Sequence, residues 1–155
     1  MAPRIIAVVG SPRKGGNTEI LCNVALEAAA KEGCLTELVP LRGKSVRGCI
    51  ACGKCWEKKD GACHGPGDDF HAVWEKIKAA DGIILASPTY FGSATAELKA
   101  VMDRSGNVSM ANGYLLAGKA GGPIVVARRA GTGCCTSGTT WGTCSSHCSP
   151  TCSPT

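Results

Sequence analysis

The sequence contains no long hydrophobic run. Apolar residues make up 44% of its 155 residues, yet no apolar stretch approaches the roughly 18–20 residues that a helix needs to cross a bilayer. The stretch IIAVVG near the N-terminus is too short for the core of a signal peptide. We therefore expect a cytoplasmic protein that does not associate with a membrane.

Clustered positive charge is also missing. The formal net charge is only +5, aromatic residues make up 5% of the chain, and Lys and Arg are interleaved with Asp and Glu. Because nucleic-acid binding needs a basic patch, we do not expect a nucleic-acid partner. The sequence also offers no Ser-His-Asp arrangement and no catalytic carboxylate pair, since Asp68 and Asp69 are interpreted as helix caps.

The chain has the length of one domain, and short apolar runs alternate in it with helical patterns. Strands are predicted at 4–10, 34–41, 81–88 and 121–131, and helices at 18–33, 68–80 and 95–106. This alternation predicts an α/β fold with a parallel sheet. Right-handed crossovers then bring the loops that follow the strands to one edge of the sheet.

Two of the predicted helices have an apolar face. In the helix over 68–80 the face consists of Phe70, Val73, Trp74 and Ile77. In the helix over 18–33 the predicted face consists of Ile20, Leu21, Val24, Ala25 and Ala28. We expect both faces to pack against the sheet.

The loop GSPRKGGNT, residues 10–18, joins the first predicted strand to a helix. Backbone N–H groups and the positive end of the helix dipole meet there, which favours an anion. The pattern is neither G-x-x-x-x-G-K-[ST] nor G-x-G-x-x-G, so a nucleoside triphosphate and a dinucleotide pyrophosphate are both disfavoured. A single terminal phosphate fits best, and the alternative is a plain glycine-rich turn with a helix cap.

Three segments, GSPRKGGNTEIL, ASPTYFGSATAELKAVMDR and VVARRAG, together resemble the flavodoxin-like NADPH-dependent FMN reductases. The resemblance is specifically to the iron–sulfur flavoprotein branch. It implies a flavodoxin-like doubly wound parallel sheet in three α/β/α layers. It assigns the FMN phosphate to the first loop, through Ser11, Arg13, Gly16, Asn17 and Thr18.

The same resemblance places the isoalloxazine ring of FMN along the loop after the third strand. The residues that it assigns there are Pro88, Thr89, Tyr90, Phe91 and Gly92. A loop of Pro, Tyr, Phe and Gly provides a flat apolar wall and backbone donors next to a ring system. The alternative is that Tyr90 and Phe91 are core or interface aromatics.

Four cysteines follow the second predicted strand with the spacing C-x2-C-x2-C-x7-C, at Cys49, Cys52, Cys55 and Cys63. Two successive C-x2-C steps suit a cubane cluster better than a tetrahedral zinc ion. The resemblance implies a [4Fe–4S] cluster on these four residues, on the same edge of the sheet as the flavin. Zinc and metal-free thiols remain open as alternatives.

Several features around this motif support the prediction of a wrapped metal loop. Gly53 and Gly61 would permit a tight turn of the chain. Lys54, Lys58 and Lys59 would offset negative charge, and His64 could act as a further donor, although a surface role is simpler. Cys22 and Cys34, outside the motif, are interpreted as small buried hydrophobic residues.

The composition changes at residue 131. From there to the C-terminus every residue except Trp141 and His147 is Gly, Thr, Cys, Ser or Pro. Residues 131–155 are therefore predicted to be a poorly ordered tail behind an FMN-binding domain over 1–130. Members of the family continue with a fifth strand and a last helix, which we expect to be lacking here. A shift of reading frame would explain such a tail.

These observations predict an FMN-dependent oxidoreductase with a [4Fe–4S] cluster. It would exchange electrons between NAD(P)H, or a ferredoxin-like carrier, and an acceptor, with the chemistry carried by the flavin and not by a catalytic side chain. The resemblance also implies a homo-oligomer. One alternative is a cluster-free NAD(P)H-dependent FMN or quinone reductase. A second is a non-catalytic cysteine-rich metal-binding protein.

Overall fold

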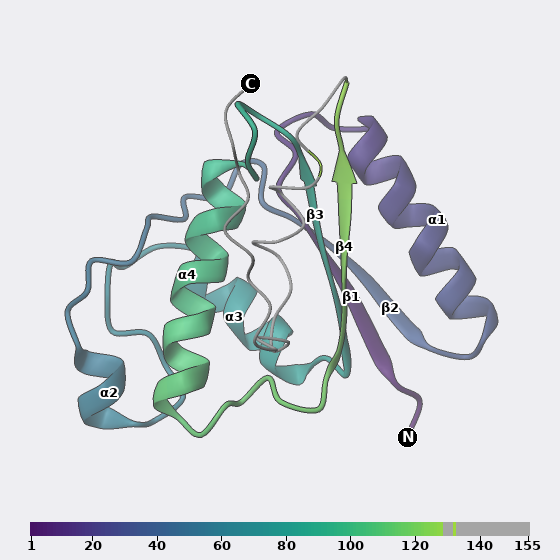
Figure 1. Cartoon of the computed structure of the whole chain (residues 1–155). Coiled ribbons are helices and arrows are strands. Elements are labelled where there is room, and N and C mark those ends of the chain that lie inside the picture. The colour runs from purple at the N-terminus through teal and green to yellow at the C-terminus, as the bar shows by residue number, and fades with distance from the viewer. Residues whose placement is uncertain (129–131, 133–155) are drawn as a thin grey trace, which may run out of the picture.

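The computed structural model of the protein describes residues 1–128 and residue 132. Strands and helices alternate as predicted, and one further short helix lies in the cysteine segment (Figure 1). The elements are β1 (Arg4–Val9), α1 (Asn17–Lys31), β2 (Leu35–Pro40), α2 (Lys54–Lys58), α3 (Phe70–Ala79), β3 (Gly82–Pro88), α4 (Ala96–Ala111) and β4 (Ala120–Val126). The predicted tail over 131–155 lies outside the described residues apart from residue 132, so its disorder and origin stay predictions.

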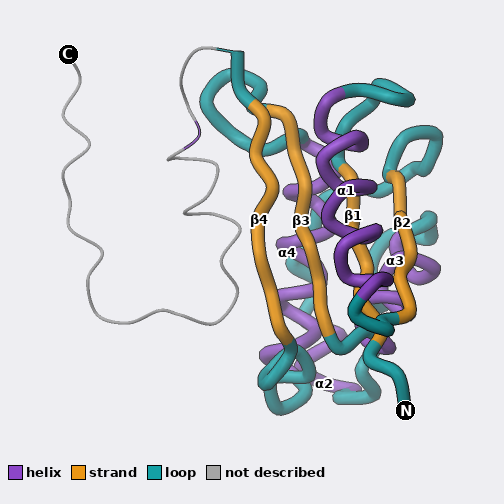
Figure 2. The backbone as a smooth tube through the Cα atoms, turned by 90° about the vertical axis from the view of Figure 1, so that its right-hand side faces the viewer, coloured by secondary structure: helices purple, strands orange, loops and turns teal. Residues whose placement is uncertain are grey.

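The four strands form one parallel sheet in the order β2-β1-β3-β4. This is the order of the first four strands in flavodoxin-like doubly wound folds. Helix α1 covers one face of the sheet, and α3 and α4 cover the other (Figures 1 and 2). Because the strands are parallel, their carboxyl ends meet at one edge, at the top of Figure 1.

The core lies in two layers, one on each side of the sheet. Alternate residues of β1 point to opposite faces, as the period of a strand requires. Ile6 and Val8 pack in the layer of α3 and α4, whereas Ala7 and Val9 pack in the layer of α1. The predicted apolar face of α3 is confirmed, with Phe70, Val73, Trp74 and Ile77 all buried.

The predicted apolar face of α1 is wrong. Ile20, Leu21 and Val24 are 51%, 47% and 58% exposed, and the side chains that pack on the sheet are those of Cys22 and Leu26. The helix is apolar over much of its circumference, so its own period does not select one face.

Strand β4 forms an edge of the sheet. Within residues 1–128 no strand pairs with its outer side. A fifth strand would follow β4 in the chain, so its expected lack falls outside the described residues. Pro123 lies in β4, and an edge strand is the position that tolerates a residue without a backbone N–H group. Across the described residues, none of the helices combines the length and the apolar character needed to cross a membrane.

Candidate functional site

The four cysteines of the motif line one cavity, here called the cysteine pocket. Cys49, Cys52, Cys55 and Cys63 surround a volume of about 190 Å³. Helix α4 forms part of its wall with Arg104, Asn107 and Val108. The tertiary structure therefore brings together the residues that the sequence predicts as ligands.

Backbone turns make the chain wrap around this pocket. Gly53, which precedes α2, and Gly61 both have φ of +70°, in the left-handed region that glycine adopts without strain. This confirms the predicted role of the two glycines. Ala51 and Lys59 also lie in the left-handed region, with φ of 52° and 50°. Strained residues of this kind persist where the surrounding structure requires them, which is typical of binding sites.

The cysteine sulfurs influence one another electrostatically. Burial raises the pKa of the Cys55 thiol, a hydrogen bond to the backbone partly counteracts it, and the neighbouring Cys63, Cys49 and Cys52 raise it further. The Cys55 thiol therefore favours its neutral form in the metal-free protein.

Hydrogen-bond donors also approach the cysteines of the pocket. Among the described residues, no group of three or more Cys, His, Asp or Glu side chains is placed to hold one metal ion, although the four cysteines line the same cavity. Two donors point at Cys49 Sγ, namely the Ala51 N–H at 3.4 Å and Asn107 Nδ2 at 3.9 Å.

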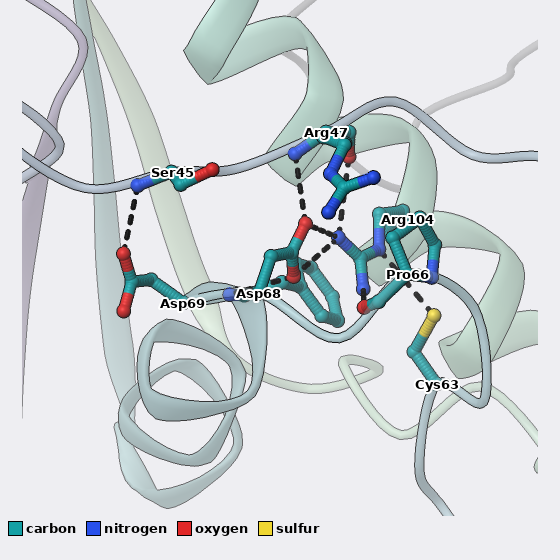
Figure 3. A network of polar contacts seen from close by, with 8 residues as sticks. Ser45, Arg47, Cys63, Pro66, Asp68, Asp69 and Arg104 are labelled. Atoms are coloured by element: carbon teal, nitrogen blue, oxygen red, sulfur yellow. Dashed lines mark hydrogen bonds and ion pairs between the residues drawn. The ribbon is translucent and has the colours of Figure 1, made fainter.

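A buried polar network adjoins the pocket (Figure 3). The guanidinium of Arg104, on α4, forms an ion pair with Asp68, and their side chains are 0% and 1% exposed. Arg104 Nε also donates a hydrogen bond to Cys63 Sγ at 3.4 Å. Burial alone would raise the pKa of Asp68, but the hydrogen bonds from the Arg47 N–H, Arg104 and the Phe70 N–H lower it below its usual value.

Sequence reasoning missed this network. Asp68 is interpreted there as a helix cap, and it does accept the Phe70 N–H at 3.1 Å. Its main partner is nevertheless Arg104, while Asp69 precedes α3 and makes no side-chain cap bond. A signal was present, because Arg104 falls between Val101 and Val108 on the apolar period of α4, where a charged residue needs a buried partner.

The position of the pocket differs from the prediction. The segment after β2 begins at the carboxyl edge of the sheet, but α2 lies beside the other end of α4 (Figure 1). At 1.5 Å per residue, Arg104 lies about 12 Å along α4 from Ala96, where the helix begins. The segment between β2 and α3 is long enough to run along the whole of α4. The spacing of the cysteines in the sequence does not show at which end of α4 they lie.

The predicted phosphate loop lies at the carboxyl edge, between β1 and α1. Gly15 has φ of +67°, and Gly16 precedes α1 without any side-chain cap bond. Neither the phosphate site nor the alternative of a plain glycine-rich turn is tested by this geometry, so both stay predictions. Ser11 and Thr18 are buried, with 4% and 3% exposure, while Arg13 and Asn17 are exposed.

A second ion pair supports this loop and was not foreseen. Glu19, in the first turn of α1, accepts the Gly15 N–H at 3.3 Å and forms an ion pair with Arg42. Arg42 follows β2, and the Leu41 N–H binds the carbonyl of Val9 at 2.9 Å, which brings the two loops together. Only the strand order places Arg42 there, so the sequence gives no direct signal for it.

The loop after β3 presents its aromatic residues to solvent. Tyr90 is 46% exposed and Phe91 is 110% exposed, so they do not belong to the core. The alternative that they are interface aromatics stays open. Phe91 has φ of 49°, which is rare for a bulky residue, and Gly92 follows with φ of 81°. Pro88 ends β3 and is half-buried.

The two predicted FMN loops lie next to each other. The Gly10 N–H donates to the carbonyl of Ala86 at 2.8 Å, joining the ends of β1 and β3. The Thr89 N–H donates to the carbonyl of Val126 at 2.8 Å, whereas the buried Thr89 Oγ1 has no hydrogen-bond partner among the residues that the structure describes. The edge thus offers a buried hydroxyl and exposed rings close to a helix N-terminus.

The remaining predicted residues take simpler positions. Cys22 is fully buried, as predicted, and Cys34 is half-buried. His64 lines the cysteine pocket, and its Nε2 lies 2.8 Å from Asp60 Oδ2. Its other ring nitrogen lies 3.4 Å from Lys58 Nζ.

The chain is similar to several known proteins. The sequence profile described as NADPH-dependent FMN reductase matches residues 3–141. An iron-sulfur flavoprotein of Methanocaldococcus jannaschii is 44% identical over 123 residues, which are 79% of this chain and 61% of the relative. An iron-sulfur flavoprotein of Methanosarcina thermophila is 42% identical over 102 residues, 66% of this chain and 52% of the relative. The chain therefore spans about half to three fifths of the length of these relatives.

Solved structures show the same fold. The crystal structure of RosB with bound 8-demethyl-8-formylriboflavin-5′-phosphate superimposes with a TM-score of 0.70 at 20% identity, covering 88% of this chain and 56% of RosB. An apo NADH:FMN oxidoreductase superimposes with a TM-score of 0.57 at 24% identity, covering 81% of this chain and 59% of that protein. The fold is flavodoxin-like, as the sequence predicts.

Proposed function

The chain belongs to the NADPH-dependent FMN reductase family, and we propose that it is an FMN-dependent oxidoreductase whose cysteine pocket holds a [4Fe–4S] cluster. The observation that carries this proposal is the convergence of Cys49, Cys52, Cys55 and Cys63 on one cavity. Family membership supports the flavin, and the relatives named iron-sulfur flavoproteins support the cluster.

The chain would hold the FMN phosphate at the N-terminus of α1. The first backbone N–H groups of that helix have no side-chain cap, so they are available to an anion at the positive end of the helix dipole. Ser11 and Thr18 would add hydroxyl donors, and Arg13 and Asn17 would reach the phosphate from solvent. Gly16 has room for this approach because it carries no side chain.

The loop after β3 would support the flavin ring. Tyr90 and Phe91 offer exposed aromatic surface, and burying such surface against a ring system is favourable. Thr89 and Gly92 would bring backbone and hydroxyl groups to the polar edge of the ring, and Pro88 would stiffen the start of the loop. The unpartnered Thr89 Oγ1 is available for this purpose.

When bound, FMN supplies the redox chemistry, taking electrons from NAD(P)H or a ferredoxin-like carrier and exchanging them with the cluster. The side chains of this protein would anchor and orient the cofactors, and none is needed as a catalytic acid or base. Within one chain, the cysteine pocket is separated along α4 from the carboxyl edge of the sheet, where FMN would bind. Electrons would then pass between the cluster of one chain and the flavin of another chain in a homo-oligomer.

An anaerobic visible spectrum, combined with iron and acid-labile sulfide assays on the full chain, tests the proposal. We expect a flavin spectrum after incubation with FMN, together with cluster absorption and iron and sulfide in equal amounts. Flavin without iron would instead indicate a cluster-free FMN or quinone reductase. Metal without flavin would indicate a non-catalytic metal-binding protein, and a folded sample that binds neither would contradict every version of the proposal.

A further inference from the structure

We propose that Arg104 is a positioning residue of the cysteine pocket, which fixes the two ends of the cysteine segment and directs a hydrogen bond at the sulfur of Cys63. It would thereby control how tightly the cluster is held and how easily it is reduced. This inference rests on the proposed function. It concerns a residue outside the cysteine motif, on a helix that is distant from that motif in sequence.

The side chain of Arg104 spans the two ends of the cysteine segment (Figure 3). Its Nη1 donates to the carbonyl of Arg47 at 3.2 Å, just before Cys49 in sequence. Its Nη2 donates to the carbonyl of Pro66 at 3.3 Å, shortly after Cys63. One guanidinium therefore closes the loop that carries all four cysteines.

Asp68 completes this closure. Its Oδ1 and Oδ2 lie 2.8 and 2.7 Å from Arg104 Nη1, and its Oδ2 also accepts the Arg47 N–H at 2.8 Å. The peptide groups on both sides of the Arg47 α carbon are thus held, one through the N–H and the other through the carbonyl. The guanidinium is further fixed over the ring of Phe70, 4.0 Å from its centroid. These contacts hold the guanidinium in the orientation in which Nε faces Cys63 in the pocket.

The contact between Arg104 Nε and Cys63 Sγ is what distinguishes a site from a structural ion pair. A thiol is a weak acceptor, but a sulfur that carries negative charge accepts strong, charge-assisted hydrogen bonds. A cysteine that binds an iron–sulfur cluster does so as a thiolate, which is such a sulfur. The contact at 3.4 Å is therefore worth most when Cys63 is a cluster ligand.

A hydrogen bond to a ligand sulfur has a defined effect on a cluster. Reduction adds negative charge to the ligand sulfurs, so such a hydrogen bond favours the reduced form and raises the reduction potential. Arg104 would act through its Nε contact with Cys63 and not through net charge, because Asp68 compensates the charge of its guanidinium.

The test compares three variants of the full chain after anaerobic reconstitution with ferrous iron and sulfide. Arg104→Gln removes the charge and the fork of donors, and Arg104→Lys keeps the charge but not the fork. Arg47→Gln is the matched control, because the Arg47 side chain is exposed and its contacts with Asp68 and Arg104 use only its backbone. The readouts are iron per chain at limiting iron, the midpoint potential of the cluster, and the thermal midpoint of the cluster-free protein.

We expect Arg104→Gln to bind iron on the order of 10-fold more weakly and to shift the midpoint potential to more negative values. Arg104→Lys should lie between this variant and the wild type, and Arg47→Gln should match the wild type. A lower thermal midpoint alone would reflect only the ion pair. The potential of Arg104→Lys is the decisive measurement, because this variant keeps the charge that Asp68 compensates but loses the Nε contact with Cys63.

The outcomes separate this inference from the proposed function. If the wild type takes up no iron and sulfide, the proposed function fails and this inference fails with it. If the wild type assembles a cluster while both Arg104 variants keep its iron affinity and potential, only this inference is overturned. If both Arg104 variants fail to fold while Arg47→Gln folds, Arg104 serves the fold alone and the inference is likewise overturned.

Discussion

A β carbon placed on Gly10 would lie 2.5 Å from Oγ1 of Thr95, and 2.8 Å from the β carbon of Leu98. No side chain other than hydrogen fits between the end of β1 and the start of α4. This close approach lets the loop after β1 run beside the loop after β3, where the flavin is proposed to bind. The glycine therefore has a packing function in addition to its place in the loop.

The first prediction concerns this contact. Gly10→Ala should lower the free energy of unfolding by about 1–3 kcal/mol, as overpacking of a tight site does, and should weaken FMN binding. Gly106→Ala is the matched control, because a β carbon there meets nothing within 4 Å and the residue lies inside α4. It should raise the free energy of unfolding by roughly 0.5–1 kcal/mol. Urea unfolding of both variants measures these changes. An unchanged free energy of unfolding for Gly10→Ala would contradict the prediction.

The second prediction concerns the buried charge of Asp68. Asp68→Asn leaves the Arg104 guanidinium buried without a counter-charge, which typically costs about 3–5 kcal/mol in the free energy of unfolding. Asp69→Asn is the control, because Asp69 is exposed and its carboxylate accepts only the Ser45 N–H in the described structure. Equal stability of the two variants in urea unfolding would show that the pair contributes little.

The same pair predicts a pH dependence. The pKa of Asp68 is lowered in the folded state, because the hydrogen bonds from Arg47, Arg104 and Phe70 outweigh the effect of burial. A lowered folded pKa gives a contribution to stability that is complete above the unfolded pKa of about 3.9 and is lost as the pH falls through the folded value. The difference in unfolding free energy between the wild type and Asp68→Asn should therefore shrink below about pH 4. A difference that stayed constant down to acid unfolding would contradict the assignment.

The third residue to test is Phe91. Phe91 has a backbone in the left-handed region, which costs a non-glycine residue about 1 kcal/mol. Phe91→Gly removes this strain, so the free energy of unfolding should not fall. The FMN affinity should decrease roughly tenfold, or about 1.4 kcal/mol, because a stacking ring is lost. Tyr114→Gly provides the control, since Tyr114 is also exposed with φ of 62° but follows α4 at the other end of the sheet. Fluorescence titration with FMN should show unchanged affinity for Tyr114→Gly. An equal loss of FMN affinity in both variants would show that Phe91 does not belong to the flavin site.

Thiol reactivity should differ sharply along the chain. Burial, with the charge of Glu19 as a smaller cause, raises the pKa of Cys22 to about 11. At pH 8 roughly one in a thousand of these thiols would then be ionised, whereas Cys49 and Cys52 are exposed. Alkylation followed by mass spectrometry should label Cys49 and Cys52 first in metal-free protein and Cys22 only on unfolding. Protection of Cys49 and Cys52 after reconstitution is expected, and rapid labelling of Cys22 in the folded protein would contradict its burial.

Much of the fold could be predicted because each strand and helix has a local signature. The run RIIAVV gives β1, and the spacing of Phe70, Val73, Trp74 and Ile77 gives the buried face of α3. The face of α1 could not be predicted in this way, since Ile20 and Leu21 are as apolar as the residues that are buried instead. Periodicity selects a face only when the other side of the helix is polar.

By itself, the sequence determined the α/β class, the glycine-rich loop before α1 and the four-cysteine motif, because these depend on residues that are close together in the chain. Only the tertiary structure decided which residues adjoin the motif. Arg104 meets Cys63 and Asp68, and Arg42 meets Glu19, through the packing of α4 and the order of the strands. A charged side chain that becomes buried on folding requires a partner of opposite charge. Which residue provides that partner depends on the folded structure and not on the local sequence.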